Sequence, residues 1–103
     1  MPKSFRSTFR SRRVVGTTTK LTKDDWSKIF AHKWPAEYRL ALEVIRDNGN
    51  KPILGNLIEE KAPGFYVRQR DRINDIFRRI GMPFFVINVN HGIENASLQV
   101  VHR

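Results

Sequence analysis

A proline-glycine break between two apolar-faced segments is the feature that most constrains how this chain can fold. The break, Ala62-Pro63-Gly64, lies near the middle of residues 52–81. Proline interrupts the helical hydrogen-bond ladder and glycine accepts the positive φ that ends many helices, so one helix cannot run through this point. We therefore expect one helix over residues 52–61 and another over about residues 66–80, joined by a short turn.

The helix expected over residues 66–80 changes character along its length. Its C-terminal half carries an apolar stripe at the i, i+3, i+4, i+7 spacing of a buried helix face, whereas its first two turns are polar. The stripe consists of Ile73, Ile76, Phe77 and Ile80. Such a helix packs at one end and projects at the other. We expect its leading turns to leave the core and contact a nucleic acid.

The remaining elements follow from caps, breaks and a change of period. We expect a first helix from the N-cap Thr22 to just before Trp34-Pro35, and a second helix over about residues 35–48 with Gly49 as its left-handed cap. The expected buried face of the second helix is Tyr38, Ala41, Leu42 and Ile45. Two β-rich segments, 84–89 and 96–101, predict a hairpin. The fold class is therefore mainly α with a C-terminal β-hairpin.

Positive charge is concentrated at the N-terminus. The 103 residues include 19 Lys and Arg against 10 Asp and Glu, which gives a net charge of +9. Residues 1–20 hold six of the basic residues, no acidic residue and no periodic apolar face. We expect a basic, disordered arm over residues 1–20 and one domain over residues 21–103. This layout is typical of nucleic-acid binders, although acidic membranes and acidic proteins attract the same charge.

The sequence offers little that would support catalysis. It contains no cysteine, and its three histidines lie far apart without metal-ligand spacing. It also lacks a nucleophile elbow and a phosphate-binding loop. We expect no enzymatic activity, no metal, no cofactor and no small-molecule substrate. No apolar run approaches the ~20 residues of a membrane span, and the absence of cysteine fits a reducing, intracellular location, cytoplasmic or nucleoid-associated.

From about residue 35 onward, the order helix, helix-turn-helix and terminal hairpin resembles a winged helix-turn-helix domain. The resemblance lies in architecture and covers about two thirds of the chain. It implies that a recognition helix over about residues 67–80 lies in the major groove of double-stranded DNA. It also implies that the hairpin, or wing, contacts the backbone or the minor groove. Because a single module binds weakly, we expect a homodimer or an array on DNA.

The recognition helix supplies most of the candidate DNA-contacting residues. Arginine can bind guanine through a bidentate fork, and glutamine or asparagine can do the same for adenine. Arg68, Arg72 and Arg79 share one flank with Asp75, while Arg70 and Asn74 lie on the other, and the pattern leaves open which flank faces the groove. The full set on this helix is Arg68, Gln69, Arg70, Arg72, Asn74 and Arg79, with Arg78 near its far end.

The wing and the arm supply the remaining candidates. The wing tip carries Asn90, His91 and Asn95, but its loop contains Glu94 and no Lys or Arg, which departs from a typical wing. The basic residues of the arm are expected to follow phosphates or occupy a minor groove. The arm candidates are Arg10, Arg12 and Arg13.

Several functions remain open at this point. As a DNA-binding protein, the chain would be a transcriptional regulator or an accessory factor in replication, recombination or partition. A fold does not fix a function, so a winged helix that binds an acidic protein partner is one alternative, with the outer hairpin strand pairing edge to edge. An RNA-binding protein is the other, because arginine-rich surfaces also bind RNA.

Overall fold

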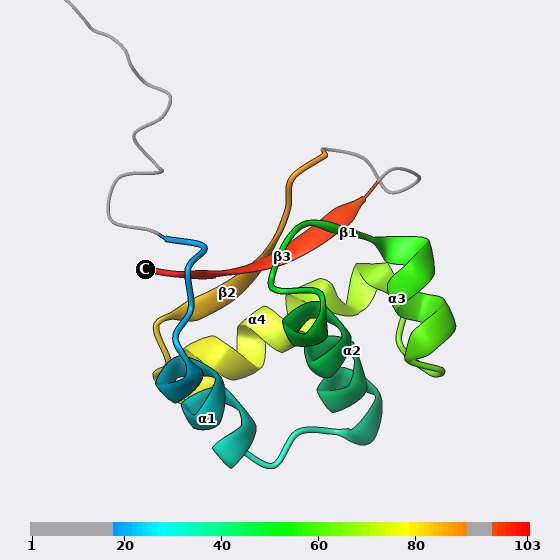
Figure 1. The fold of residues 1–103 in the computed structure, drawn as a ribbon. Coiled ribbons are helices and arrows are strands. Elements are labelled where there is room, and N and C mark those ends of the chain that lie inside the picture. The colour runs from blue at the N-terminus through cyan, green and yellow to red at the C-terminus, as the bar shows by residue number, and fades with distance from the viewer. Residues whose placement is uncertain (1–17, 91–95) are drawn as a thin grey trace, which may run out of the picture.

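Four α-helices and a three-stranded antiparallel sheet make up the described part of the chain (Figure 1). The structure is a computed structural model, and it describes residues 18–90 and 96–103. The helical elements are α1 (Lys23–Ala31), α2 (Ala36–Asp47), α3 (Gly55–Lys61), the single 3₁₀ turn η2 (Val67–Gln69) and α4 (Arg70–Arg79). The strands are β1 (Ile53–Leu54), β2 (Phe84–Asn88) and β3 (Ser97–His102). The expected combination of helices with a C-terminal hairpin is confirmed.

The first two helices begin and end where the sequence predicts. Thr22 caps α1 through a reciprocal pair of hydrogen bonds, because its Oγ1 accepts from the Asp25 N–H at 3.1 Å and its own N–H donates to Asp25 Oδ2 at 2.9 Å. Gly49 follows α2 at φ +70°, as a left-handed cap requires. The four residues expected on the buried face of α2 are all buried: Tyr38, Ala41, Leu42 and Ile45.

The sheet contains one strand that the sequence pattern did not predict. The strand order is β1-β3-β2, and Ile53 and Leu54 pair with Leu98 and Ser97 of β3. The helix expected over residues 52–61 is therefore wrong at its start, since α3 begins only at Gly55. A two-residue strand has no period of its own, and its state is decided by the distant strand with which it pairs.

Two asparagines terminate the hydrogen bonding of the sheet on its two sides. Val86 of β2 lies opposite Val100 of β3, and each directs its N–H and C=O away from the other strand. The side-chain amide of Asn74 binds both groups of Val86, at 2.6 and 2.9 Å. Asn50, which is buried at φ +57°, binds both groups of Val100, at 2.9 and 2.7 Å. Each amide takes the place of a neighbouring strand.

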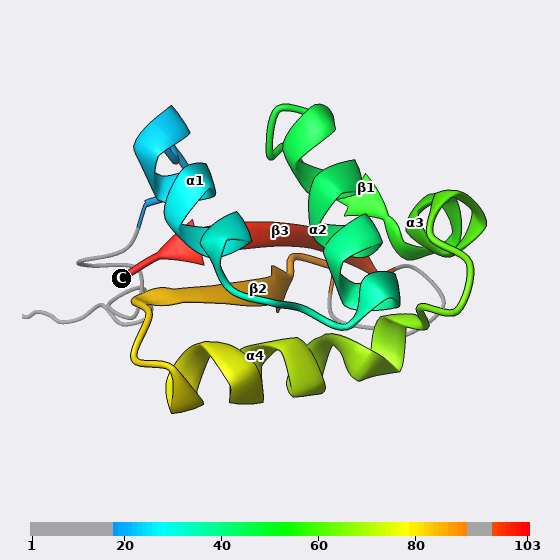
Figure 2. The same cartoon turned by 90° about the horizontal axis from the view of Figure 1, so that it is seen from below.

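The core lies between the helices and one face of the sheet. Strand residues Phe84, Val86, Leu98 and Val100 pack there against buried side chains from α1, α2 and α4. Phe77 of α4 is central to this packing, because its ring lies 5.1 Å from the ring of Trp34 and 6.0 Å from that of Phe84. Viewed from below, α4 runs alongside β2, and α2 lies nearer to β3 (Figure 2).

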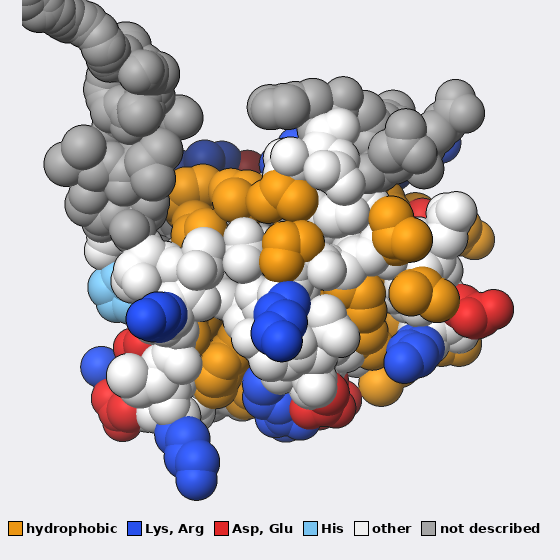
Figure 3. All heavy atoms as spheres, turned by 45° about the horizontal axis from the view of Figure 1, so that its top comes forward, with side chains coloured by type: hydrophobic (Ala, Val, Ile, Leu, Met, Phe, Trp, Pro, Cys, Tyr) orange, Lys and Arg blue, Asp and Glu red, His pale blue; other side chains and the backbone are white. Residues whose placement is uncertain are grey.

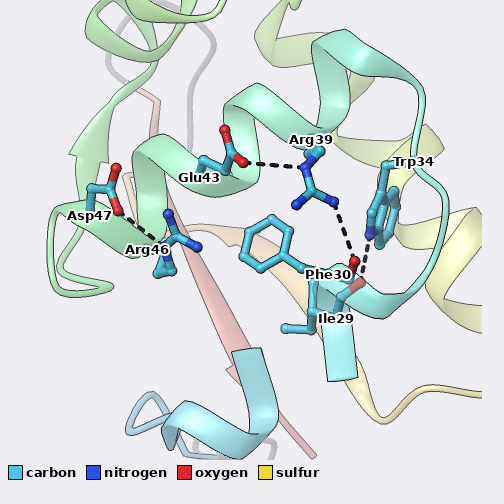
Figure 4. A network of polar contacts seen from close by, with 7 residues as sticks. All are labelled: Ile29, Phe30, Trp34, Arg39, Glu43, Arg46 and Asp47. Atoms are coloured by element: carbon cyan, nitrogen blue, oxygen red, sulfur yellow. Dashed lines mark hydrogen bonds and ion pairs between the residues drawn. The ribbon is translucent and has the colours of Figure 1, made fainter. Parts of the chain in front are cut away.

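The interface between α1 and α2 uses arginine as a structural residue (Figure 4). The guanidinium groups of Arg39 and Arg46 lie 5.0 and 4.9 Å from the centre of the Phe30 ring. Arg39 also donates to Glu43 at 3.2 Å and to the carbonyl of Phe30 at 3.3 Å. Arg46 donates to Asp47 at 3.0 Å. Both arginines of α2 are thus held by a carboxylate and an aromatic face.

Some apolar side chains remain on the surface. Orange side chains gather on the face that Figure 3 presents, over the sheet and near α3. Leu54 of β1 and Leu57 of α3 are 49% and 42% exposed. Their spacing within residues 52–61 predicts a buried helix face shared with Ile53 and Ile58, but only Ile53 and Ile58 are buried. None of the helices in the described ranges has the length and apolarity that a membrane span requires.

Candidate nucleic-acid interface

Helix α3 fixes the position at which η2 begins. Glu59 of α3 accepts a hydrogen bond from the backbone N–H of Val67 at 2.9 Å, which satisfies a donor at the start of η2. Gly55 packs directly against the same residue, because a Cβ built on Gly55 would lie only 2.3 Å from Val67 Cγ2. The two contacts hold the end of the turn close to α3, and α4 continues from η2 without a gap.

The turn before η2 directs one aromatic residue inward and the next outward. Phe65 is 1% exposed, Tyr66 is 59% exposed and Val67 is 9% exposed. Tyr66 has extended backbone angles, φ −126° and ψ 144°, and successive side chains of an extended segment point to opposite sides. The Tyr66 ring therefore lies on the surface, immediately before the first turn of η2.

One flank of α4 faces the sheet. Asn74 uses its amide to bind Val86 of β2, as described above. Arg70 lies one turn earlier on the same flank, where it donates to the Val86 carbonyl at 3.5 Å and pairs with Asp71 at 3.5 Å. The structure thus places these two candidate residues against β2, and the amide of Asn74 is already occupied by backbone groups.

The other flank of η2–α4 is exposed and basic. Arg68, Arg72 and Arg79 are exposed, and none of them has an ion-pair partner within the described residues. The neighbouring Asp75 is paired with Arg78. Of the two flanks of α4, the one that carries Arg68, Arg72 and Arg79 is therefore the flank that is open to solvent. In Figure 2 the side of α4 that points away from the sheet is not covered by another described element.

A shallow hollow lies at the N-terminal end of this exposed flank. Its lining residues, which define what we term the Tyr66 hollow, are Tyr66, Arg68, Gln69 and Arg72. Gln69 Oε1 accepts a hydrogen bond from the Tyr66 N–H at 2.9 Å, so part of this candidate residue serves as a cap. Sequence reasoning did not single out Tyr66. The available signal was the pair Phe65-Tyr66 in a non-helical turn, where only one of two neighbours can point inward.

The wing and the arm fall largely outside the described residues. Asn90 is described at the start of the hairpin loop, where its N–H donates to Asn88 at 2.9 Å and its Nδ2 donates to Ser97 Oγ at 2.9 Å. His91, Asn95, Arg10, Arg12 and Arg13 lie outside the described residues. At the end of the expected arm, Thr18 exchanges two backbone hydrogen bonds of 2.8 Å with His102 and so extends the sheet beside β3.

Metal chemistry finds no support in the described ranges, which contain no group of three or more His, Asp or Glu side chains able to hold an ion. The described residues instead form an exposed basic flank on η2–α4, with the aromatic side chain of Tyr66 at its N-terminal end. Comparison of the chain with protein-family models, with curated proteins and with solved structures found no match. The function is therefore inferred from the chain's own residues.

Proposed function

We propose that this protein binds double-stranded DNA as a winged helix-turn-helix domain, with η2–α4 in the major groove. The observation that carries the proposal is the contrast between the two flanks of α4. One flank is bound to β2 through Asn74, and the other carries Arg68, Arg72 and Arg79, which have no ion-pair partner within residues 18–90 and 96–103. Unpaired guanidinium groups on a fixed helix are suited to both phosphates and guanine edges.

The order of the elements supports the same proposal. Helix α3, a short turn, the η2–α4 unit and the β2–β3 hairpin follow one another in the order expected of this fold. Asn74 joins the recognition helix to the hairpin, so α4 and β2 would approach DNA as one rigid body. The basic N-terminal arm adds charge for contacts with phosphates.

A salt-dependent titration tests this function. The full chain is titrated against a fluorescent random-sequence duplex by anisotropy at several salt concentrations. If the protein neutralises about six phosphates, affinity falls roughly a thousandfold between 50 and 200 mM salt, because counterions are released on binding. A duplex selected from a random pool then supplies the specific site. Absence of binding at low salt, despite a net charge of +9, would contradict the proposal.

A protein-binding role is the second candidate, and exposed Leu54 and Leu57 favour it. Pairing through the outer edge of β2 is less favoured, because Asn74 already occupies the backbone of Val86. Leu57→Ser would weaken capture of an acidic protein partner and leave DNA binding unchanged. Exposed Tyr66 also keeps an RNA role open, since aromatic side chains stack on unpaired bases. Competition between duplex DNA and single-stranded RNA separates these two ligands.

A further inference from the structure

We propose that the Tyr66 hollow binds one phosphate group of the DNA backbone and so fixes the position of α4 along the duplex. The inference rests on the proposed function and gives it a specific contact. It assigns a ligand-contacting role to Tyr66, whose aromatic ring is 59% exposed beside two arginines that lack ion-pair partners in the described residues.

The polar groups that line the hollow are mainly hydrogen-bond donors. The guanidinium groups of Arg68 and Arg72 can only donate. Gln69 already uses its Oε1 to accept from the Tyr66 N–H, which leaves its Nε2 as the group available to a ligand. The Tyr66 hydroxyl can donate as well. A phosphate presents only acceptors and carries a full negative charge, so it matches this lining in both hydrogen bonding and charge.

The side chains, rather than the start of the helix, carry the attraction. The backbone N–H of Val67 is bound to Glu59, and that of Gln69 is bound to the Tyr66 carbonyl at 2.8 Å. These amides are therefore not available to an anion. The guanidinium groups, the phenol and Gln69 Nε2 are the side-chain donors that line the hollow, which makes it sensitive to single side-chain substitutions.

The shape of the hollow favours a phosphate over a base edge. Base edges lie at the floor of the major groove, where projecting side chains reach them, whereas phosphates project from the surface of the duplex. A concave surface fits the projecting group. Guanine N7 and O6 are also acceptors, so a base contact by the same arginines is the alternative that the experiment must distinguish.

The experiment uses the duplex selected with the wild-type protein. Each phosphate is replaced in turn by an uncharged methylphosphonate, and each guanine by 7-deazaguanine. Affinity is measured for the wild type, Arg72→Gln and Tyr66→Phe. Arg103→Gln is the control, because Arg103 lies 5.1 Å from the Phe85 ring and donates its N–H to Pro83, beyond the C-terminal end of α4, whereas the hollow lies at the N-terminal end. Tyr66→Phe keeps the ring and removes only an exposed hydroxyl, so the fold is preserved.

The expected result is a coupling at one position. One methylphosphonate weakens binding of the wild type and of Arg103→Gln about tenfold, as expected for the loss of a charged hydrogen bond. The same replacement changes the affinity of Arg72→Gln much less, because one charged contact to that phosphate is already lost. For Tyr66→Phe the reduction is smaller, because only the neutral hydrogen bond of the phenol is already lost. Equal losses for all four proteins at every phosphate, or coupling to 7-deazaguanine instead, would overturn the inference while DNA binding stands. If the wild type binds no duplex, both proposals fail.

Discussion

The arginines of α2 and those of the η2–α4 flank are the same residue type in opposite circumstances. Arg39 and Arg46 of α2 each contact a carboxylate and the Phe30 ring (Figure 4). Arg68 and Arg72 have neither kind of partner among the described residues. Both pairs are at least partly exposed, so exposure alone does not separate them.

This difference in pairing indicates which arginines are available to bind a ligand. A guanidinium already paired with a carboxylate contributes little net field, and releasing it for DNA breaks an existing contact. A guanidinium without a partner gains its first charged contact on binding. The net charge of +9 is therefore a poor guide by itself, and the pairing state of each arginine is the more informative quantity.

The largest expected effect comes from replacing the two pairs separately. Arg68→Gln with Arg72→Gln should weaken duplex binding by about a hundredfold, because two charged contacts to DNA are lost. Arg39→Gln with Arg46→Gln lowers the net charge by the same two units, from +9 to +7. This control should lose stability and keep nearly all of its DNA affinity at low salt.

Anisotropy titrations and urea denaturation of both double variants provide the measurement. Equal losses of affinity in the two variants would mean that total charge, rather than the exposed flank, governs binding. The pairing state of the arginines on α2 and on η2–α4 would then not determine which of them bind DNA.

The next effect tests geometry without changing charge. Gly55→Ala places a Cβ 2.3 Å from Val67 Cγ2, and the β-branched Val67 cannot easily turn away. We expect a loss of about 1–3 kcal/mol in the free energy of unfolding from this overpacking, together with weaker DNA binding as η2 shifts. Val67→Ala in the Gly55→Ala background removes the clashing methyl and should recover part of both. Loss of stability with unchanged DNA affinity would show that the setting of η2 does not matter.

Local periodicity allowed much of the fold to be predicted, but not the contacts that orient the site. The spacing of Tyr38, Ala41, Leu42 and Ile45 predicted the buried face of α2 because a helix repeats every 3.6 residues. The strand β1 was missed, since two residues cannot show a period. The sequence likewise left open which flank of α4 is exposed. That is decided by the hydrogen bonds between Asn74 of α4 and Val86 of β2, which join two separate elements.

A smaller effect should come from releasing a paired arginine on each surface. Asp75→Asn removes the partner of Arg78 on α4, and Asp47→Asn removes the partner of Arg46 on α2. Each raises the net charge from +9 to +10. We expect Asp75→Asn to tighten DNA binding a few-fold and to steepen the salt dependence by up to about 0.9 in log–log slope, as one more phosphate is neutralised. Asp47→Asn should leave the slope unchanged, and the same steepening in both variants would argue against a localised interface.

The smallest expected effect lies at the cap of α1, where charge serves only the fold. The hydrogen bond from the Thr22 backbone N–H lowers the pKa of the Asp25 carboxyl below its ordinary value of 3.8. The folded state therefore favours ionised Asp25, and this stabilisation is complete above the unfolded-state pKa and is lost as pH falls through the lower folded-state pKa. Asp25→Asn should lower the urea midpoint slightly near neutral pH, and the difference from wild type should vanish in acid. Asp24→Asn, which removes only the exposed pair with Lys28, is the matched control and should change the midpoint less. If the lower urea midpoint of Asp25→Asn persisted unchanged into acid, the ionised carboxylate would not be what stabilises the cap. We expect the DNA affinity of both variants to equal that of the wild type, because the charges of α1 stabilise the fold and do not contact DNA.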